Sequence, residues 1–414
     1  MSVTQTRQGF YYGWVIALGA AVLLLVTNGM VLGGLSVFDE AILGTLQESS
    51  GQPSMRGDLN LRALITFWGS GALAPLAGAI ADRIGVRPLM VVGLALLAGG
   101  YFYYGMIQSL AEIYTIHAAF ALSLATCGLV VNVMLVSKWF VRNRGFAIGI
   151  ALAGTSLGNA ILAPANAWLI EQVGWRTAFQ WTAVIPVLMI PLVLFVLRER
   201  PVDMGSEGAS GSRRSAAAAP AEDMTYWAAL GTANFWILAL IAMCTFYSIL
   251  AMSAHVYLHM RDEGFQPQVA AFGQTVMFAT GLAAKVGSGL LADRFGRKPI
   301  FTGTLAFMCG GAWLIPGASE NMVWMALFLF GLGWGGLYTL LQLLAADYFG
   351  VRHLGKILGT ITVLDTFGGG MGPFVTGVLY DRFGSYTVPF TMIAVLVTVA
   401  LLLSTLYRAR PEAV

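Results

Sequence analysis

The sequence is poor in charged residues. Only 10% of its 414 residues are Asp, Glu, Lys or Arg, whereas a soluble domain carries about 25%. With 57% hydrophobic residues and a mean hydropathy of +0.75, the chain would expose too much apolar surface in water. This composition excludes an ordinary soluble enzyme and makes lipid the solvent for most of the chain.

Cysteine, histidine clusters and strong net charge are also lacking. The three cysteines lie in apolar runs, so no disulfide framework is expected. The formal net charge of +3 is too small to favour nucleic acid. His255 and His259 have the spacing of a zinc-binding pair, but no third ligand is evident. No nucleophile–base arrangement is evident either, so we expect no enzymatic activity, no cofactor and no metal.

Long apolar runs dominate what is present. A membrane helix needs about 20 mostly apolar residues, and the sequence predicts twelve such spans and an all-α membrane protein. The predicted spans are 12–36, 59–81, 88–107, 112–136, 145–171, 178–197, 232–256, 269–292, 299–316, 322–348, 355–379 and 387–407. The segment before the first span has one arginine and no small-residue cleavage site, so we expect an uncleaved anchor.

Lysine and arginine are distributed unequally between the two sides of these spans. Of the 23 basic residues, 17 lie at the termini or in loops on the same side. The positive-inside rule therefore places both termini in the cytoplasm. We expect the membrane to be a bacterial-type inner membrane. The opposite side is assigned Arg56, Arg62, Arg176, Arg261 and Arg382. One further basic residue, Lys285, falls inside a span.

The two halves of the chain repeat each other. Residues 78–88 (GAIADRIGVRP) match residues 289–299 (GLLADRFGRKP) at an offset of 211, and a second set of glycines and arginines matches at 210. This indicates a duplicated six-helix unit. We expect bundles at 1–200 and 226–414, joined by a Gly-, Ser- and Ala-rich cytoplasmic linker at 201–225.

The repeated loop, with Asp82-Arg83 and Asp293-Arg294 at its centre, resembles the signature loop of the major facilitator superfamily. The resemblance implies two six-helix bundles around a central cavity, working by alternating access. It also implies that charges at the cytoplasmic helix ends brace the inner gate. Keeping positive charge inside is the alternative role for these residues. The gating candidates are Asp82, Arg83, Arg87, Arg142, Asp293, Arg294, Arg297 and Arg352.

Within that superfamily, three segments are similar to the monocarboxylate transporter and oxalate–formate antiporter branch. They are Tyr12-Gly13-Trp14-Val15, residues 138–149 (KWFVRNRGFAIG) and residues 153–158 (AGTSLG). The resemblance implies a secondary transporter of a small organic anion. Its other partners would be a proton or a counter-anion and the lipid bilayer, and we expect a monomer.

Two charges are predicted at membrane depth. Lys285 lies 8 residues before Asp293, and Asp365 lies 9 residues after Lys356, which places them about 12 Å and about 14 Å from the cytoplasmic ends of their helices. Such residues are functional by default. We expect them to face each other, with Lys285 binding an anionic substrate and Asp365 neutralising it and taking the coupling proton. The alternatives are a lysine that extends to the inner surface and an aspartate that bonds a neighbouring helix.

The resemblance supports Lys285 more than Asp365. Relatives carry a basic residue four positions before the motif glycine, and Lys285 lies four before Gly289. Monocarboxylate transporters carry an Asp where this chain has Gly281, and oxalate-type antiporters carry a second basic residue in the region of Asp365. A dicarboxylate held by two cations is therefore not expected. A monocarboxylate, or a zwitterion whose amine meets Asp365, fits better.

Further polar and aromatic residues are weaker candidates. Aromatic side chains on the tenth span line the cavity in oxalate-type relatives, and buried amides could donate to a carboxylate. Packing and helix-to-helix hydrogen bonds are the alternatives. The candidates are Trp334, Tyr338, Asn28, Asn132 and Gln342. The glycine run 368–372 is interpreted as a hinge or a close-packing patch.

Two other functions remain open at this point. A drug or cation exporter of the same fold would use Asp365 as the charge that binds its substrate. A non-transporting nutrient sensor is the second alternative, but sensors usually gain a long soluble tail, and residues 408–414 are short.

Overall fold

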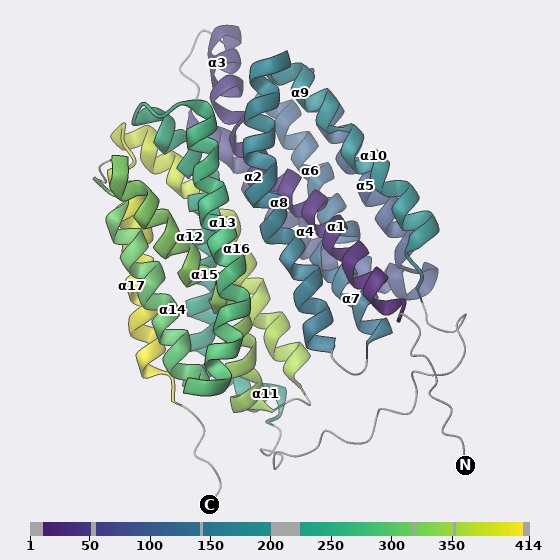
Figure 1. The fold of residues 1–414 in the computed structure, drawn as a ribbon, viewed down its shortest axis with the longest axis vertical. Coiled ribbons are helices and arrows are strands. Elements are labelled where there is room, and N and C mark those ends of the chain that lie inside the picture. Colours follow the sequence, from purple (N-terminus) through teal and green to yellow (C-terminus); the bar gives the residue numbers. More distant parts are fainter. Residues whose placement is uncertain are drawn as a thin grey trace, which may run out of the picture.

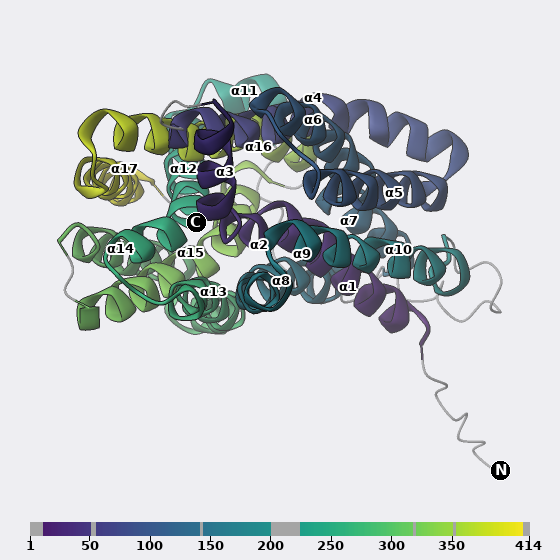
Figure 2. The ribbon, with the colours of Figure 1, turned by 90° about the horizontal axis from the view of Figure 1, so that it is seen from above.

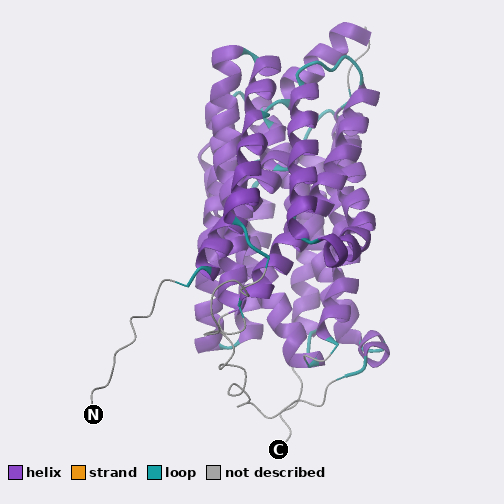
Figure 3. Ribbon diagram, turned by 90° about the vertical axis from the view of Figure 1, so that its right-hand side faces the viewer, coloured by secondary structure: helices purple, strands orange, loops and turns teal. Residues whose placement is uncertain are grey.

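The computed structural model describes residues 11–50, 55–140, 144–199, 224–317, 320–350 and 353–408. Within these ranges the chain is helical and contains no strand. The long helices run roughly parallel to one another (Figure 3). The all-α fold predicted from the apolar runs is confirmed.

The helices fall into two groups that follow one another along the sequence (Figure 1). The first group is α1 (Gly13–Val31), α2 (Gly33–Ser36), α3 (Asp39–Ser50), α4 (Arg56–Ile84), α5 (Val86–Tyr104), α6 (Leu110–Cys127), α7 (Leu129–Trp139), α8 (Arg144–Val173), α9 (Trp175–Thr182), α10 (Val184–Pro191) and the π-helix η1 (Leu192–Val196). The second group is α11 (Tyr226–Leu230), α12 (Ala233–Asp262), α13 (Pro267–Phe295), α14 (Arg297–Leu314), α15 (Glu320–Phe349), α16 (Leu354–Phe383) and α17 (Thr387–Leu406).

Helices occupy all twelve predicted ranges. Ten helical stretches are long and apolar enough to cross a membrane, and α14 and α16 are not among these ten. Three predicted spans are interrupted, at Leu32, at Gly128 and at Ala183. Two short helices, α3 and α11, were not predicted. Of the predicted linker, residues 201–223 lie outside the described part of the chain.

Helix packing repeats between the two groups. Helix α1 packs on α8 as α12 packs on α16, and α4 packs on α6 as α13 packs on α15. The glycines matched by sequence share a positive φ, which L-residues rarely adopt. In the repeated loop φ is 89° at Gly85 and 90° at Gly296, and at the second match it is 78° at Gly174 and 68° at Gly384. The structure therefore agrees with a duplicated unit.

We call the end of the molecule that holds Tyr11, Glu199, Met224 and Arg408 the linker side, and the opposite end the distal side. The two groups meet mainly along two interfaces, α4 with α16 and α8 with α13, with a smaller contact between α2 and α12. On the linker-side halves of α4, α8, α13 and α16, several glycines face open space, with no atom within 4 Å of a built Cβ. They are Gly78, Gly149, Gly287, Gly289 and Gly359.

Other glycines allow close backbone contact between helices. A Cβ on Gly154 of α8 would lie 1.9 Å from the backbone oxygen of Ala21 on α1. On α16, a Cβ on Gly368 would lie 2.4 Å from the oxygen of Met243, and one on Gly372 would lie 2.4 Å from that of Tyr247. The glycine run on α16 is therefore a close-packing patch against α12.

We predict that Gly154→Ala destabilises the protein, because the added methyl would collide with the backbone of α1. Overpacking of this kind costs about 1–3 kcal/mol. The matched control is Gly149→Ala on the same helix, which has open space and gains helix propensity. Thermal unfolding of the purified protein in detergent compares the two. Equal melting temperatures for the two variants would contradict the close contact.

Candidate functional site

Lys285 reaches from the second group of helices to the first. It lies on α13, 10 residues before Phe295, or about 15 Å from the linker-side end of that helix. Its partly buried ammonium donates a hydrogen bond to the hydroxyl of Ser156 on α8, with an Nζ–Oγ distance of 2.7 Å. The cation therefore lies at the α8–α13 interface between the two groups.

The indole ring of Trp334 on α15 lies beside the ammonium of Lys285. The Nζ atom of Lys285 lies 4.7 Å from the centroid of the Trp334 ring, which is within cation–π range. The ring fits because residue 281 has no side chain: a Cβ on Gly281 would lie 2.7 Å from the indole. Gly281 thus makes room for the aromatic face of Trp334.

Asp365 lies on a different helix, α16, and is buried. It is 2% exposed and lies 11 residues after Leu354, about 17 Å from the linker-side end of α16. The next residue, Thr366, contacts Gly71 of α4. Asp365 therefore matches Lys285 in depth. However, Lys285 contacts Ser156 and Trp334, so the structure does not show the pairing expected from the sequence.

The remaining substrate candidates are scattered. Asn132 is buried and donates to the carbonyls of Cys127 (2.8 Å) and Gly128 (2.9 Å), at the break between α6 and α7. Asn28 is partly buried, and its amide lies 3.4 Å from the hydroxyl of Thr27. Gln342 is exposed. The side chain of Tyr338 lies outside the described part of the structure.

The described gating candidates on the linker side bind within their own groups. Arg87 donates to the backbone oxygens of Val193 and Leu194, and Arg297 pairs with Asp347 on α15. Arg83 and Arg294 are exposed. The side chains of Asp82 and Asp293, and all of Arg142 and Arg352, lie outside the described part of the structure. That these residues brace the inner gate between the two groups stays a prediction, and it would apply to a conformation in which the linker side is closed.

On the distal side, two bidentate ion pairs join the groups. Arg56 on α4 binds both carboxylate oxygens of Asp262 on α12, each at 2.8 Å. Arg261 on α12 binds both oxygens of Glu40 on α3, at 2.7 and 2.9 Å. Viewed from the distal side, α3 lies between the two groups (Figure 2). We call these two pairs the distal clamp.

Asp381 of α16 strengthens this closure from the opposite direction. Its carboxylate accepts the backbone N–H groups of Arg56 (2.8 Å) and Gly57 (2.6 Å) at the N-terminus of α4. Partial burial raises the pKa of Asp381, while the two N–H donors oppose this rise. The guanidinium of Arg56 also lies 3.9 Å from the centroid of the Tyr380 ring. The start of α4 is thus held by α12 and α16 together.

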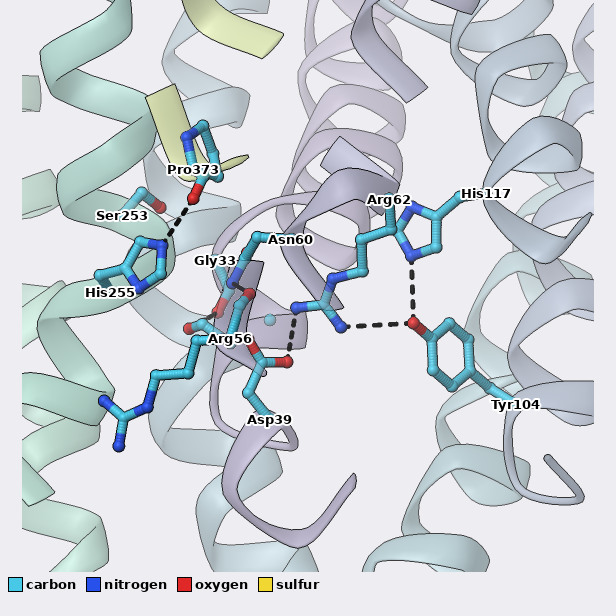
Figure 4. A network of polar contacts seen from close by, with 12 residues as sticks. Gly33, Asp39, Arg56, Asn60, Arg62, Tyr104, His117, Ser253, His255 and Pro373 are labelled. Atoms are coloured by element: carbon cyan, nitrogen blue, oxygen red, sulfur yellow. Dashed lines mark hydrogen bonds and ion pairs between the residues drawn. The ribbon is translucent and has the colours of Figure 1, made fainter. Parts of the chain in front are cut away.

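Below the distal clamp lies a buried polar network that sequence reasoning missed (Figure 4). Arg62, assigned above to the outer surface, is only 4% exposed and pairs with the fully buried Asp39 at 2.5 Å. It also donates to the hydroxyl of Tyr104 (3.3 Å), which lies 3.1 Å from Nε2 of His117. Because Arg62 falls inside the predicted span 59–81, the argument applied to Lys285 could have found it.

A small cavity of about 40 Å³ adjoins this network. Polar residues of α4 and α6 line it, including Asn60, Arg62 and His117, together with Ser253 of α12. It is therefore shared by the two groups, and it is large enough for a few water molecules.

The sequence model described as the Major Facilitator Superfamily matches residues 29–364 and 257–414. The chain belongs to this superfamily. It is accordingly a multi-pass membrane protein.

Individual relatives in this superfamily cover most of the chain. Monocarboxylate transporter 13 of Rattus norvegicus is 25% identical over 385 residues, covering 92% of this chain and 85% of the relative. Monocarboxylate transporter 11 of Homo sapiens is 25% identical over 406 residues, covering 92% and 80%. The oxalate:formate antiporter of Oxalobacter formigenes is 24% identical over 307 residues, covering 72% and 71%. The resemblance to this branch of the major facilitator superfamily is confirmed.

We predict that Arg56→Ala opens the distal side of this major facilitator protein. The substitution removes the contacts of Arg56 with Asp262 and Tyr380, and a loss of about 1–2 kcal/mol changes a two-state ratio about five- to thirtyfold. The reporter is Ser253→Cys. Ser253 lines the cavity and is 3% exposed, so the maleimide labelling rate of this cysteine in detergent should rise by that factor.

The matched control is Arg382→Ala. Arg382 is an exposed arginine on the same side whose described contact is with the neighbouring Phe383 ring. Its removal should leave the labelling rate unchanged. Equal labelling in the Arg56 and Arg382 variants would show that the clamp does not control access.

Proposed function

We propose that this protein is a secondary active transporter that moves a small organic monoanion by alternating access. The observation that carries the proposal is the ammonium of Lys285, held between the two groups of helices by Ser156 and Trp334. A hydroxyl and an aromatic face orient the cation without cancelling its charge. Lys285 therefore remains able to attract a carboxylate.

The names of the relatives support the substrate class. They include monocarboxylate transporters and an oxalate:formate antiporter. Among the described residues near Lys285, no second cation is placed on α13 or α15. We infer that the cargo carries a single carboxylate. It is either a monocarboxylate or a zwitterion whose amine binds Asp365.

The proposed mechanism moves the two bundles, residues 1–200 and 226–414, against each other. With the linker side in the cytoplasm of a bacterial-type inner membrane, the present conformation is closed to the outside and faces inward. The distal clamp supports this assignment, and so do the hydrogen bonds that Asp381 of α16 accepts from the start of α4. Reversal would break these distal contacts and bring the linker-side ends of α4, α8, α13 and α16 together.

Coupling is by a proton or by a counter-anion. A monoanion accompanied by one proton carries no net charge, so the membrane potential would not drive its movement directly. Asp365 stays the residue predicted from the sequence to take the proton. The alternative is a drug or cation exporter that binds its cargo at Asp365. It differs from the anion transporter in being stabilised by organic cations rather than by acids.

We predict that monocarboxylates stabilise the purified protein and that Lys285→Ala abolishes this effect. A ligand at about 100 times its Kd stabilises by about 2.7 kcal/mol. Loss of a hydrogen bond to a charged group weakens binding by about 1.5–3 kcal/mol. A thermal-shift panel of formate, acetate, lactate and pyruvate measures this, with amino acids and organic cations as the comparison.

The matched control is Lys138→Ala, which removes an exposed lysine at the linker side and should leave the thermal shifts unchanged. Stabilisation by organic cations in both the wild type and Lys285→Ala, with none by acids, would favour the exporter and reject the anion proposal. In that case Asp365→Asn should abolish the stabilisation by cations.

A further inference from the structure

The Asp39–Arg62 pair differs from the ion pairs of the distal clamp. In the clamp, both carboxylate oxygens are bound by the guanidinium, and all four side chains keep some contact with solvent. In the buried pair, Arg62 binds only Oδ1 of Asp39, and Oδ2 has no hydrogen-bond partner among the described residues. The buried carboxylate is therefore only half satisfied.

Such a pair is a poor structural brace. Removing two charges from water costs several kcal/mol for each ion, and the mutual attraction repays this cost only when the remaining hydrogen bonds are satisfied. Intramembrane charges that persist under these conditions usually mark a substrate or ion pathway. The arrangement points to a pair that is made and broken during function.

The position of the pair fits a pathway. Arg62 lies six residues after the distal end of α4, and Lys285 lies 18 residues after the distal end of α13. These intervals correspond to depths of about 9 Å and about 27 Å. Arg62 borders the cavity shared by both groups of helices, where the hydroxyl of Ser253 lacks a partner among the described residues. When the distal clamp opens, Arg62 is the cation nearest to the outside at this cavity.

We propose that Arg62 is a second carboxylate-binding site, and that an incoming anion and Asp39 compete for it. The anion takes the place of Asp39 on Arg62, and the displaced Asp39 takes one proton from the outside water. When the anion passes on towards Lys285 and the cytoplasm, Asp39 releases that proton inside and pairs again with Arg62. One proton and one anion thus cross together, and this proposal rests on the function proposed above.

The charged and titratable groups around Asp39 favour Asp39 rather than His117 as the residue that takes the proton. Protonation of His117 would place a second cation in the same network as Arg62, which is unfavourable. A carboxylate that loses its cation in a buried site binds a proton more readily. The titratable and charged groups that interact with Asp39 are Arg56, Arg62, Tyr104 and Tyr257. His117 lies beyond Tyr104, and the adjacent Glu40 binds Arg261.

Reconstituted protein tests the proposal. The probe is the radiolabelled form of the acid that gives the largest thermal shift in the panel above. With the vesicle interior about one pH unit more alkaline, coupling of one proton to one anion supports about tenfold accumulation. For Asp39→Asn we expect no accumulation, while exchange of labelled for unlabelled acid at equal pH stays within about twofold of the wild type. Asp39→Glu should restore accumulation.

Two other carboxylates serve as comparisons. Asp58→Asn, an exposed carboxylate on the same side, should behave as the wild type. Accumulation that is lost in Asp365→Asn but kept in Asp39→Asn would assign coupling to Asp365 and overturn the inference. Exchange without accumulation in the wild type would also overturn it, while leaving the transporter in place. No thermal shift with any acid would reject the proposed function and the inference together.

A second variant covers the case in which Asp39→Asn does not fold because Arg62 is left unpaired. The double variant Asp39→Asn with Arg62→Gln removes both charges. We expect it to lose accumulation and to bind the acid from the distal side about tenfold more weakly. Wild-type accumulation and affinity in this variant would show that the pair only stabilises the fold.

Discussion

A charge held at membrane depth needs a partner inside the protein, because neither lipid nor bulk water can supply one. Each described charge at this depth meets the requirement differently. Lys285 has a hydroxyl and an indole face, Arg62 has a carboxylate and a phenol, and Asp365 is buried next to the contact of α16 with α4. The first two bring residues of several helices together, so the helix arrangement and the placement of charge depend on each other.

Much of the fold could be predicted from the sequence, because the apolar runs are long and the repeated loop is specific. The interruptions of the first, fourth and sixth spans could not, since Leu32, Gly128 and Ala183 lie in segments as apolar as their neighbours. Helix α3 was missed because its polar sequence is typical of a loop. It becomes a helix in a setting where Asp39 and Glu40 bind arginines of α4 and α12.

The candidate site was predicted unevenly, for a physical reason. Lys285 stands alone within a long apolar run, so its depth alone made it conspicuous. Arg62 also lies inside its predicted span, but near the start, where a basic residue is normally interpreted as part of the loop. Its burial and its pairing with Asp39 are seen only in the structure. The partners of Lys285 were also beyond reach, because Ser156 and Trp334 come from helices far away in the sequence.

Helix α3 belongs to the first group of helices, yet its Glu40 binds Arg261 on α12 of the second group at the distal side. The paired surface of α3 and α12 exists only while the distal side is closed. An antibody fragment or nanobody raised against that composite epitope would hold the protein in one conformation. The same short helix could thus serve to trap the conformation that is closed on the distal side in structural and inhibition studies.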